Sequence, residues 1–203
     1  MEKPADILIL FAHPALQNSR IHIKASEAVK SLDGVTFHDL YEEYPDFSID
    51  YKREQTLLLK HDIYVFQFPL YWYSTPAILK EWQDLVLEHN WAYGPRGRAL
   101  KGKKFMCAVS AGGAERVYSE SEHNRFSLRK LLAPLEKSAA QCGMEFLPPF
   151  AIYNTFAIAA DEIQWHAEQY RRLITALRFN KIHNSKLKKL SIINHNLDDV
   201  IAE

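Results

Sequence analysis

Short, continuously apolar segments recur along this chain, and each is followed by a longer segment with helical spacing. Residues 7–11, 63–68 and 105–110 are too short for core helices and lack the polar alternation of half-exposed strands. Parallel strands that are covered by helices on both faces have this composition. The alternation therefore predicts an α/β fold, in which right-handed crossovers join parallel strands.

Five strands are predicted, because residues 35–40 and 144–152 also have strand character. Pro148 and Pro149 cannot donate backbone hydrogen bonds, so the fifth strand is expected to be irregular and to lie at an edge. Residues 41–50 are expected to form a turn-rich loop. Helices are predicted at residues 21–32, 51–60, 76–88, 128–141 and 161–179. One domain, residues 1–180, accounts for these elements, and a polar, lysine-bearing tail follows at residues 181–203.

Charge and cysteine content argue against several classes of protein. The 25 Lys and Arg residues balance 25 Asp and Glu residues, so no net positive field favours nucleic acid. Cys107 and Cys142 are too few for a zinc site or a disulfide framework, and no metal is predicted. No apolar run approaches the ~20 residues of a membrane span, and the first apolar run is too short for a signal peptide. The expected location is the cytoplasm.

Ligands of open parallel sheets bind outside the carboxyl ends of the strands, so the loops after strands 1, 3 and 4 are the candidate sites. The first loop contains His13 and ends with Ser19, a helix-capping residue. The helix end, with His13 and His22 beside it, is suited to a phosphate. This loop contains neither a Gly-x-x-x-x-Gly-Lys nor a Gly-x-Gly-x-x-Gly sequence, which argues against a P-loop or a dinucleotide-binding Rossmann domain. An ordinary capped helix is the alternative.

The loop after the third strand carries three consecutive aromatic residues, Tyr71, Trp72 and Tyr73, between Pro69 and Pro76. At least one ring is expected to face outward, which exposes apolar area unless something covers it. A planar ligand would cover such a surface. Core packing or a dimer interface is the competing interpretation.

The loop after the fourth strand contains Gly112 and Gly113, followed by Tyr118 and His123. Glycines let the backbone approach a flat ring closely and direct N–H groups at it. Backbone N–H groups, a phenol and an imidazole could stabilise the negative charge that a reduced flavin develops. Purely structural roles for the tyrosine and the histidine are the alternative.

Taken together, these loops resemble those of the flavodoxin-like NAD(P)H:quinone oxidoreductases. The likeness is strongest to the KefF/KefG type, whose members are ancillary subunits of glutathione-gated potassium efflux systems. It covers residues 6–178 and also includes the motifs Ala12-His13-Pro14, Tyr44-Pro45-Asp46-Phe47, Trp91-Ala92-Tyr93-Gly94 and Leu147-Pro148-Pro149-Phe150. The resemblance implies a flavodoxin-like, doubly wound sheet of five parallel strands in the order 2-1-3-4-5, with helices on both faces.

The resemblance also implies the roles of individual residues. Catalysis falls to Tyr118 and His123 as a charge-relay pair, although the spacing between them is one residue shorter than in the animal enzymes. Ser110-Ala111 stands where the family often has two threonines. The cofactor-binding residues that the resemblance implies are His13, Ser19, Arg20, Ile21, His22, Pro69, Leu70, Tyr71, Trp72, Tyr73, Ser110, Ala111, Gly112 and Gly113.

The implied activity is a two-electron hydride transfer from NAD(P)H to a quinone, through FMN (FAD being the alternative), with ping-pong kinetics in one pocket. The family resemblance further implies a homodimer in which the second subunit completes each pocket. In the alternative function, the chain regulates a potassium efflux antiporter and lies at the inner face of the cell membrane through that partner. A one-electron flavodoxin carrier is disfavoured by the neutral net charge, and a hydrolase by the absence of a Gly-x-Ser-x-Gly turn.

Overall fold

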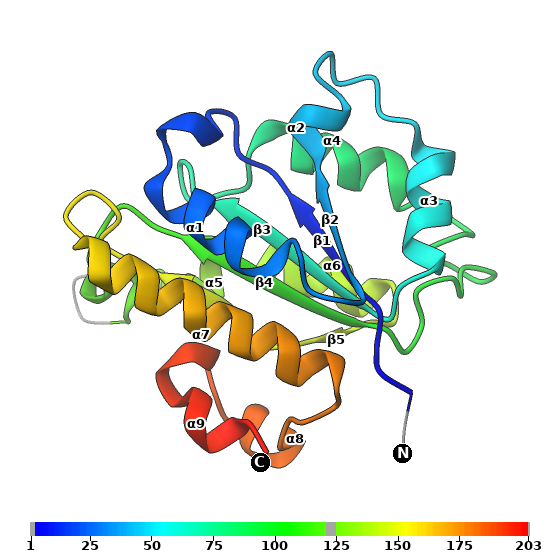
Figure 1. Cartoon of the computed structure of the whole chain (residues 1–203). Coiled ribbons are helices and arrows are strands. Elements are labelled where there is room, and N and C mark those ends of the chain that lie inside the picture. Colours follow the sequence, from blue (N-terminus) through cyan, green and yellow to red (C-terminus); the bar gives the residue numbers. More distant parts are fainter. Residues whose placement is uncertain (1–2, 121–124, 203) are drawn as a thin grey trace.

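A parallel β-sheet forms the centre of the molecule in this computed structural model, which describes residues 3–120 and 125–202 (Figure 1). Its strands are β1 (Ile7–Phe11), β2 (Val35–Asp39), β3 (Ile63–Pro69), β4 (Lys104–Ser110), β5 (Glu145–Phe146) and β6 (Phe150–Ile152). All pairings are parallel and the order is β2-β1-β3-β4-β5, with β6 also paired to β4. The predicted flavodoxin-like order 2-1-3-4-5 is confirmed.

The fifth strand is divided into two pieces. β5 pairs with the start of β4, and β6 pairs with its end, from Ala108 to Ser110. Pro148 and Pro149 occupy the gap, where no N–H is available for the ladder. The prolines thus divide the expected irregular edge strand into two short strands, β5 and β6.

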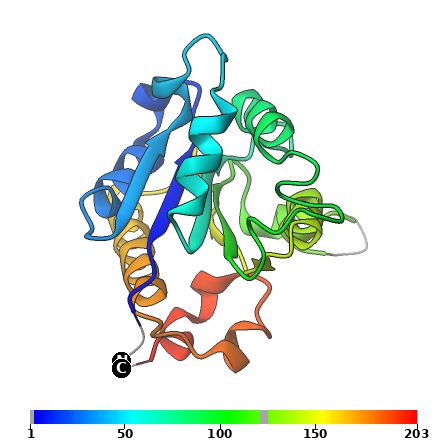
Figure 2. The same cartoon turned by 90° about the vertical axis from the view of Figure 1, so that its right-hand side faces the viewer.

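Helices cover both faces of the sheet (Figures 1 and 2). The helices α1 (Arg20–Val29) and α7 (Ala160–Arg178) pack on one face and contact each other. The other face carries α3 (Tyr51–Leu59), α4 (Ala77–Val86) and α6 (Ala133–Gln141). The shorter elements are η1 (Leu16–Asn18), α2 (Leu40–Glu43), η2 (Glu115–Tyr118), α5 (Leu128–Leu131), α8 (Asn184–Leu187), η3 (Ile193–Asn196) and α9 (Leu197–Val200).

Two local expectations need correction. The segment expected to be a loop from residue 41 begins inside α2, because the Asp39 side chain caps that turn by accepting from the Tyr41 and Glu42 amides. The single helix predicted at residues 128–141 is two helices, α5 and α6, that meet at Leu132. Pro134 lies in the first turn of α6, where its missing N–H costs no helical hydrogen bond.

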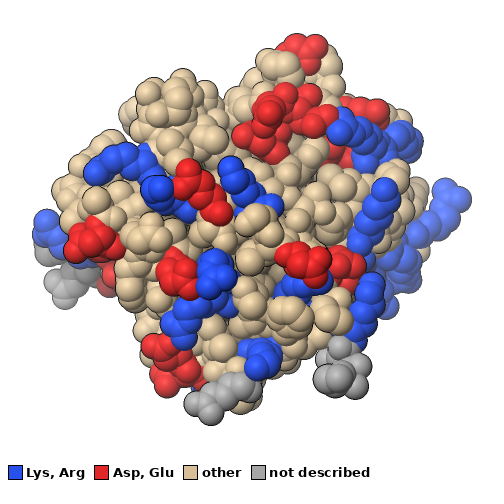
Figure 3. Space-filling view, in the orientation of Figure 1, with Lys and Arg blue, Asp and Glu red and all other residues tan. Residues whose placement is uncertain are grey.

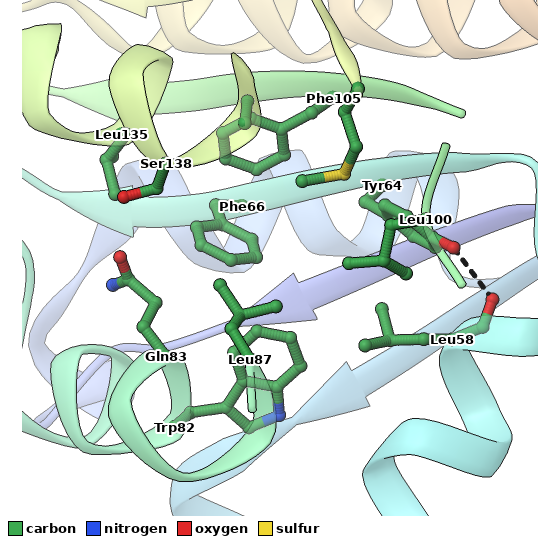
Figure 4. A pocket seen from close by; sticks show the side chains of 12 residues that line it. Leu58, Tyr64, Phe66, Trp82, Gln83, Leu87, Leu100, Phe105, Leu135 and Ser138 are labelled. Carbon is green, nitrogen blue, oxygen red and sulfur yellow. Dashed lines mark hydrogen bonds between the residues drawn. The ribbon is translucent and has the colours of Figure 1, made fainter. Parts of the chain in front are cut away.

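Aromatic side chains fill the core between the sheet and the α3–α4–α6 layer. The Phe66 ring lies 4.6 Å from the Phe105 ring and 5.6 Å from the Trp82 ring, centre to centre (Figure 4). The Tyr64 hydroxyl donates to the Leu58 carbonyl at 2.8 Å. A cavity of about 20 Å³ remains between these side chains, which is room for one water molecule at most. This cavity is therefore a packing defect of the core, and ligand binding has to be sought elsewhere.

A buried carboxylate joins four elements in the same core. Glu54 of α3 is fully buried and accepts hydrogen bonds from His38 Nε2 at 2.9 Å, Tyr44 Oη at 2.7 Å and Trp82 Nε1 at 2.7 Å. Burial alone raises the pKa of Glu54, but the three donors and the His38 ring outweigh burial, so the pKa is lowered. The carboxylate stays ionised and links β2, the end of α2, α3 and α4.

Residues 181–202 fold back against the layer formed by α1 and α7. Ile193, Leu197 and Val200 are buried in the same apolar cluster as the inner side of α7. Asp198 pairs with Arg172 of α7 at 2.7 Å. Figures 1 and 2 show α8 and α9 beneath α7, near the end of the sheet that carries β5. The lysines of this segment made it look polar in sequence, but its isoleucine, leucine and valine residues provide an apolar inner side.

Charges of both signs are mixed over the outer face of α1 and α7 (Figure 3). Lys24 pairs with Glu27 on α1, and Arg171 pairs with Glu168 on α7. This face therefore offers no broad field of one sign. Within the described part of the chain, no helix is both long and apolar enough to cross a membrane.

Candidate functional site

An open cleft of about 620 Å³ lies at the carboxyl ends of β1, β3 and β4. The three loops that follow these strands meet there, as the topology of the sheet predicts. The predicted site residues that line the cleft are His13, Ser19, Arg20, Ile21, Pro69, Leu70, Tyr71, Trp72, Tyr73, Ser110, Gly112, Gly113 and Tyr118.

The amino end of α1 opens into this cleft. Ser19 is the N-cap, and its hydroxyl accepts the His22 amide at 3.1 Å. The first intrahelical hydrogen bond runs from the Ile23 amide to the Ser19 carbonyl. The Arg20 and Ile21 amides come before it and therefore have no acceptor within the helix. Such free amides and the positive end of the helix dipole favour an anion. The Arg20 side chain donates a hydrogen bond to the Ile158 carbonyl at 3.3 Å, and it adds a full positive charge to this side of the cleft.

His13 presents a hydrogen-bond donor to the cleft. Its Nδ1 accepts the Ala15 amide at 3.1 Å, so the proton of the neutral ring sits on Nε2. Burial lowers the pKa of His13, which keeps the ring neutral near pH 7. The ring also meets Tyr71 edge-on, with centres 6.0 Å apart. His13 is therefore a neutral donor between the helix end and the aromatic loop.

His22 lies behind the cleft wall. Its side chain is buried against Phe11 and His13, and burial lowers its pKa to about 3. Nε2 lies 2.8 Å from the hydroxyl of Ser110, and Ser110 lines the cleft. The position of His22 three residues after the N-cap turns it toward the sheet with Ala25, Ser26 and Val29. Its contact with the site therefore runs through Ser110.

The aromatic loop is a strained two-residue turn. The Tyr71 amide donates a hydrogen bond to the Ser74 carbonyl at 3.2 Å, and the Ser74 amide donates one to the Tyr71 carbonyl at 3.0 Å. Trp72 and Tyr73 between them have φ of 48° and 64°, the left-handed values that a type I′ turn requires. Asn-Gly is the usual choice for such a turn, and each bulky residue costs roughly 1 kcal/mol there.

This turn also leaves its rings uncovered. The Trp72 side chain is 93% exposed and that of Tyr73 60% exposed. Strain combined with exposed aromatic surface is typical of a binding site.

The two glycines after β4 make room for aromatic rings. A Cβ atom on Gly112 would come within 2.4 Å of Phe156, and one on Gly113 within 3.2 Å of Tyr118. Neither glycine has a left-handed φ. The glycines thus allow the wall formed by Tyr118 and Phe156 to close onto the backbone of this loop.

Two more predicted residues, besides His22, are not among the described residues that line the cleft. Ala111 is buried, and its amide donates to the Ile152 carbonyl at 2.8 Å, away from the cleft lining. His123 lies outside the residues that the structure describes, so the predicted Tyr118–His123 pair has no geometry here.

Sequence reasoning missed four residues that line the cleft: Ala15, Asn18, Thr155 and Phe156. The last two follow β6, whose carboxyl end lies beside that of β4. The rule that pointed to the other loops applies equally to this one, but its sequence contains no recognisable motif. Phe156 is 88% exposed and adds a second aromatic wall to the cleft.

Over residues 3–120 and 125–202, no three His, Cys, Asp or Glu side chains gather where they could share a metal ion. Cys107 and Cys142 are both buried, and burial raises the pKa of each, to about 11 for Cys142. Neither cysteine lines the cleft.

Comparison with protein families gives a match over most of the domain. The model of a family described as having a flavodoxin-like fold matches residues 5–174. The chain belongs to this family. YdeQ of Bacillus subtilis, which is named an uncharacterized NAD(P)H oxidoreductase, is 47% identical over 173 residues, which are 85% of this chain and 88% of that protein. The potassium-efflux ancillary protein KefF of an Enterobacter species is 43% identical over 178 residues, 88% of this chain and 99% of that protein.

Solved structures are similar as well. The general stress protein 14 of Treponema denticola, crystallised in complex with FMN, is 39% identical, with a TM-score of 0.80 over 85% of this chain and 99% of that one. The NADPH-quinone reductase of P. pentosaceus is 32% identical, with a TM-score of 0.74 over 83% of this chain and 96% of that one. The family resemblance inferred from the loop motifs is confirmed.

Proposed function

We propose that this chain binds FMN in the cleft and catalyses two-electron transfer from NAD(P)H to a quinone. One observation carries the proposal: a free helix end and a strained aromatic turn face the same cleft at the carboxyl edge of the sheet. A ligand that is anionic at one end and planar at the other satisfies both. FMN has this form, and it is named as the ligand of the Treponema denticola relative.

The phosphate of FMN would lie at the start of α1. The Arg20 and Ile21 amides, the Ser19 hydroxyl and the Arg20 guanidinium would hold it, with the Nε2 proton of His13 beside them. Binding there needs no rearrangement of the helix, because the Ser19 cap already holds the first turn.

The ring system would lie between the turn after β3 and the loop after β4. Tyr71, Trp72 and Tyr73 would cover one side, and the backbone of Ser110, Gly112 and Gly113 would approach the other. When bound, FMN supplies a centre that accepts a hydride and passes it on. The chain's own residues orient the reactants, exclude water through the aromatic walls, and donate hydrogen bonds where negative charge develops.

Tyr118 is the described side chain that we assign to proton handling. Tyr118 lines the cleft and its ring packs against Gly113. From there its hydroxyl would donate a proton to a reduced quinone oxygen. His123, its predicted partner, is proposed for the same role on the sequence resemblance alone. NAD(P)H and the quinone would occupy the same space in turn, which gives ping-pong kinetics.

A second copy of this chain would complete the cleft. Trp72, Tyr73 and Phe156 form an apolar rim that water covers poorly. We therefore propose a homodimer in which each rim is buried by the partner and by the bound substrates.

The test is to purify the full chain, record its visible spectrum, and identify any released flavin by mass. FMN is expected, with parallel lines in double-reciprocal plots for NADPH and menadione. Trp72→Ala should weaken FMN binding at least about tenfold, whereas Trp165→Ala, at an exposed tryptophan on α7, should not. A colourless protein that takes up neither FMN nor FAD would rule the proposal out.

A regulatory role is the second candidate, and it rests on the 43% identity to KefF over 99% of that protein. In this role the chain would dock on a potassium efflux antiporter at the membrane, and its oxidoreductase activity would be secondary. Co-purification with such an antiporter, and loss of potassium efflux when the gene is deleted, would support it. Normal efflux in the deletion strain would leave the enzyme activity as the main function.

A further inference from the structure

β6 lies at the edge of the sheet, and its outer side is covered by the side chain of Asn194, which belongs to the segment after α7. Asn194 Oδ1 accepts the Ala151 amide at 3.1 Å, and Asn194 Nδ2 donates to the Ala151 carbonyl at 2.9 Å. The Ile193 amide donates to the Pro149 carbonyl at 3.0 Å. Asn194 therefore takes the place of a neighbouring strand and satisfies both backbone groups of Ala151.

The loop after β4, which forms part of the cleft wall, is bonded to β6 and the residues that follow it. The Ala111 amide donates to the Ile152 carbonyl at 2.8 Å, and the Asn154 amide donates to the Gly113 carbonyl at 2.9 Å. Gly112 and Gly113 line the cleft. From the cleft outward, the order is therefore the di-glycine loop, then β6 with its extension, and then Asn194.

A second contact reaches the same wall. His195 Nε2 lies 3.2 Å from a carboxylate oxygen of Glu115, the first residue of η2. Tyr118, the last residue of η2, stacks on Tyr153, with ring centres 5.7 Å apart and planes at 28°. Tyr153 directly follows β6. Asn194 and His195 thus contact the two segments that carry the Tyr118–Tyr153 pair.

The segment that supplies these contacts is itself well anchored. Ile193 and Val200 are completely buried, and His183 bonds through its amide to the Val200 carbonyl at 2.8 Å. A rigid support of this kind transmits its position to what it holds, because packed cores are not easily deformed. The family match ends at residue 174, so the support is built from residues outside that match.

We propose that residues 181–202 are a brace that holds the di-glycine and Tyr118 wall of the cleft in its binding geometry, with Asn194 as the main positioning residue. The brace itself is defined by contacts within the chain. Its effect on FMN binding rests on the proposed function.

Asn194→Leu, in the full chain, tests the brace because leucine keeps the volume and removes both hydrogen bonds. Asn194→Asp keeps an acceptor for the Ala151 amide but faces the Ala151 carbonyl with a second acceptor. Asn196→Leu is the matched control, since Asn196 is exposed in the same segment and bonds only Asp199 among the described side chains. Amide hydrogen exchange is measured without ligand, and FMN affinity by fluorescence titration well below the melting temperature.

We expect Asn194→Leu to speed exchange at the Ala111 and Asn154 amides about tenfold and to weaken FMN binding about tenfold, with Asn194→Asp in between and Asn196→Leu unchanged. The visible circular dichroism of bound FMN should change as well, because it reports the wall around the ring. If Asn194→Leu does not fold, Asn194→Asp and His195→Gln decide the question by the same measurements.

Unchanged exchange at Ala111 and Asn154 in these variants would overturn the brace. Faster exchange with unchanged FMN affinity would make the segment a structural cover only, and would overturn its link to the site. If the wild-type chain binds no flavin, the proposed function fails, while the exchange measurements still decide whether the brace exists.

Discussion

The ring of Phe156 rests on the backbone of Gly112, so that a Cβ atom added to this glycine would stand 2.4 Å from Phe156 Cε2. The two residues lie 44 positions apart in sequence, in the loops after β4 and β6. Their contact closes one side of the cleft. The glycine is needed for the space that the ring occupies, since its φ is not left-handed.

Gly112→Ala should therefore weaken FMN binding at least about tenfold while changing the free energy of unfolding by less than about 1 kcal/mol. The stability cost is small because the Phe156 ring is 88% exposed and can swing outward. Isothermal titration of FMN and urea denaturation measure the two effects. In a Phe156→Ala background the added methyl group meets no ring, so the affinity loss caused by Gly112→Ala should largely disappear. An equal loss in both backgrounds would contradict the contact as the cause.

The aromatic turn should trade stability for affinity. Replacing Trp72 and Tyr73 by Asn and Gly suits the left-handed φ of both positions and should raise the free energy of unfolding by about 1–2 kcal/mol. The same change removes two rings from the cleft and should weaken FMN binding by at least about tenfold. Thermal melts without ligand and fluorescence titration with FMN test the pair of effects. A variant that loses both stability and affinity would show that the turn is not strained.

Glu54→Gln should destabilise the fold by about 2–4 kcal/mol. The amide group of glutamine would present a donor to one of three groups that already donate, and would leave a buried donor unsatisfied. Glu43→Gln is the control, because Glu43 pairs with Arg53 at the surface and should cost less than about 0.5 kcal/mol.

The loss of stability caused by Glu54→Gln should also depend on pH. Because the pKa of Glu54 is lowered in the fold, its contribution is present above the unfolded pKa of about 4.3 and is lost as the pH falls through the folded value. Urea denaturation at pH 7 and pH 4 measures it. The difference between wild type and Glu54→Gln should shrink at the lower pH, and a difference that grows there would contradict this assignment.

His22 should make the fold sensitive to mild acid. Its folded pKa of about 3 lies below an unfolded value of about 6.5, so between these limits the unfolded chain binds one proton more than the folded chain. Stability is therefore fully present above about pH 6.5 and falls by up to about 1.4 kcal/mol per pH unit as the pH is lowered. His13, whose pKa is also lowered by burial, contributes in the same direction.

His22→Gln should reduce the slope of stability against pH by up to about 1.4 kcal/mol per pH unit between pH 6 and pH 4. Urea denaturation at constant ionic strength measures the slope. His183→Gln, at an exposed histidine, serves as the control. An unchanged slope in His22→Gln would mean that this ring takes up its proton without unfolding.

The sequence pattern predicts the fold class and the position of the cleft, and the resemblance to a known family adds the strand order. Continuous apolar runs such as residues 7–11 suit parallel strands that helices cover on both faces, and the carboxyl ends of parallel strands share one edge. The sequence pattern therefore predicts that the loops containing Ser19, Trp72 and Gly112 meet at one edge of the sheet. Pro148 and Pro149 likewise predicted that the fifth strand is irregular, because a missing N–H is a local property, and the structure shows it as two short strands.

Which side chains of these loops face the cleft, and what supports them, depends on how the elements pack against one another in space. His22 looked like a phosphate ligand because it follows Ser19, but the rotation of α1 against the sheet turns it onto Ser110 instead. Phe156 and Asn194 carried no motif, since their importance comes from Gly112 and Ala151, which are far away in sequence. Local patterns fix periodicity and backbone preference, whereas such contacts depend on how separate elements pack in space, and that information is spread over the whole chain.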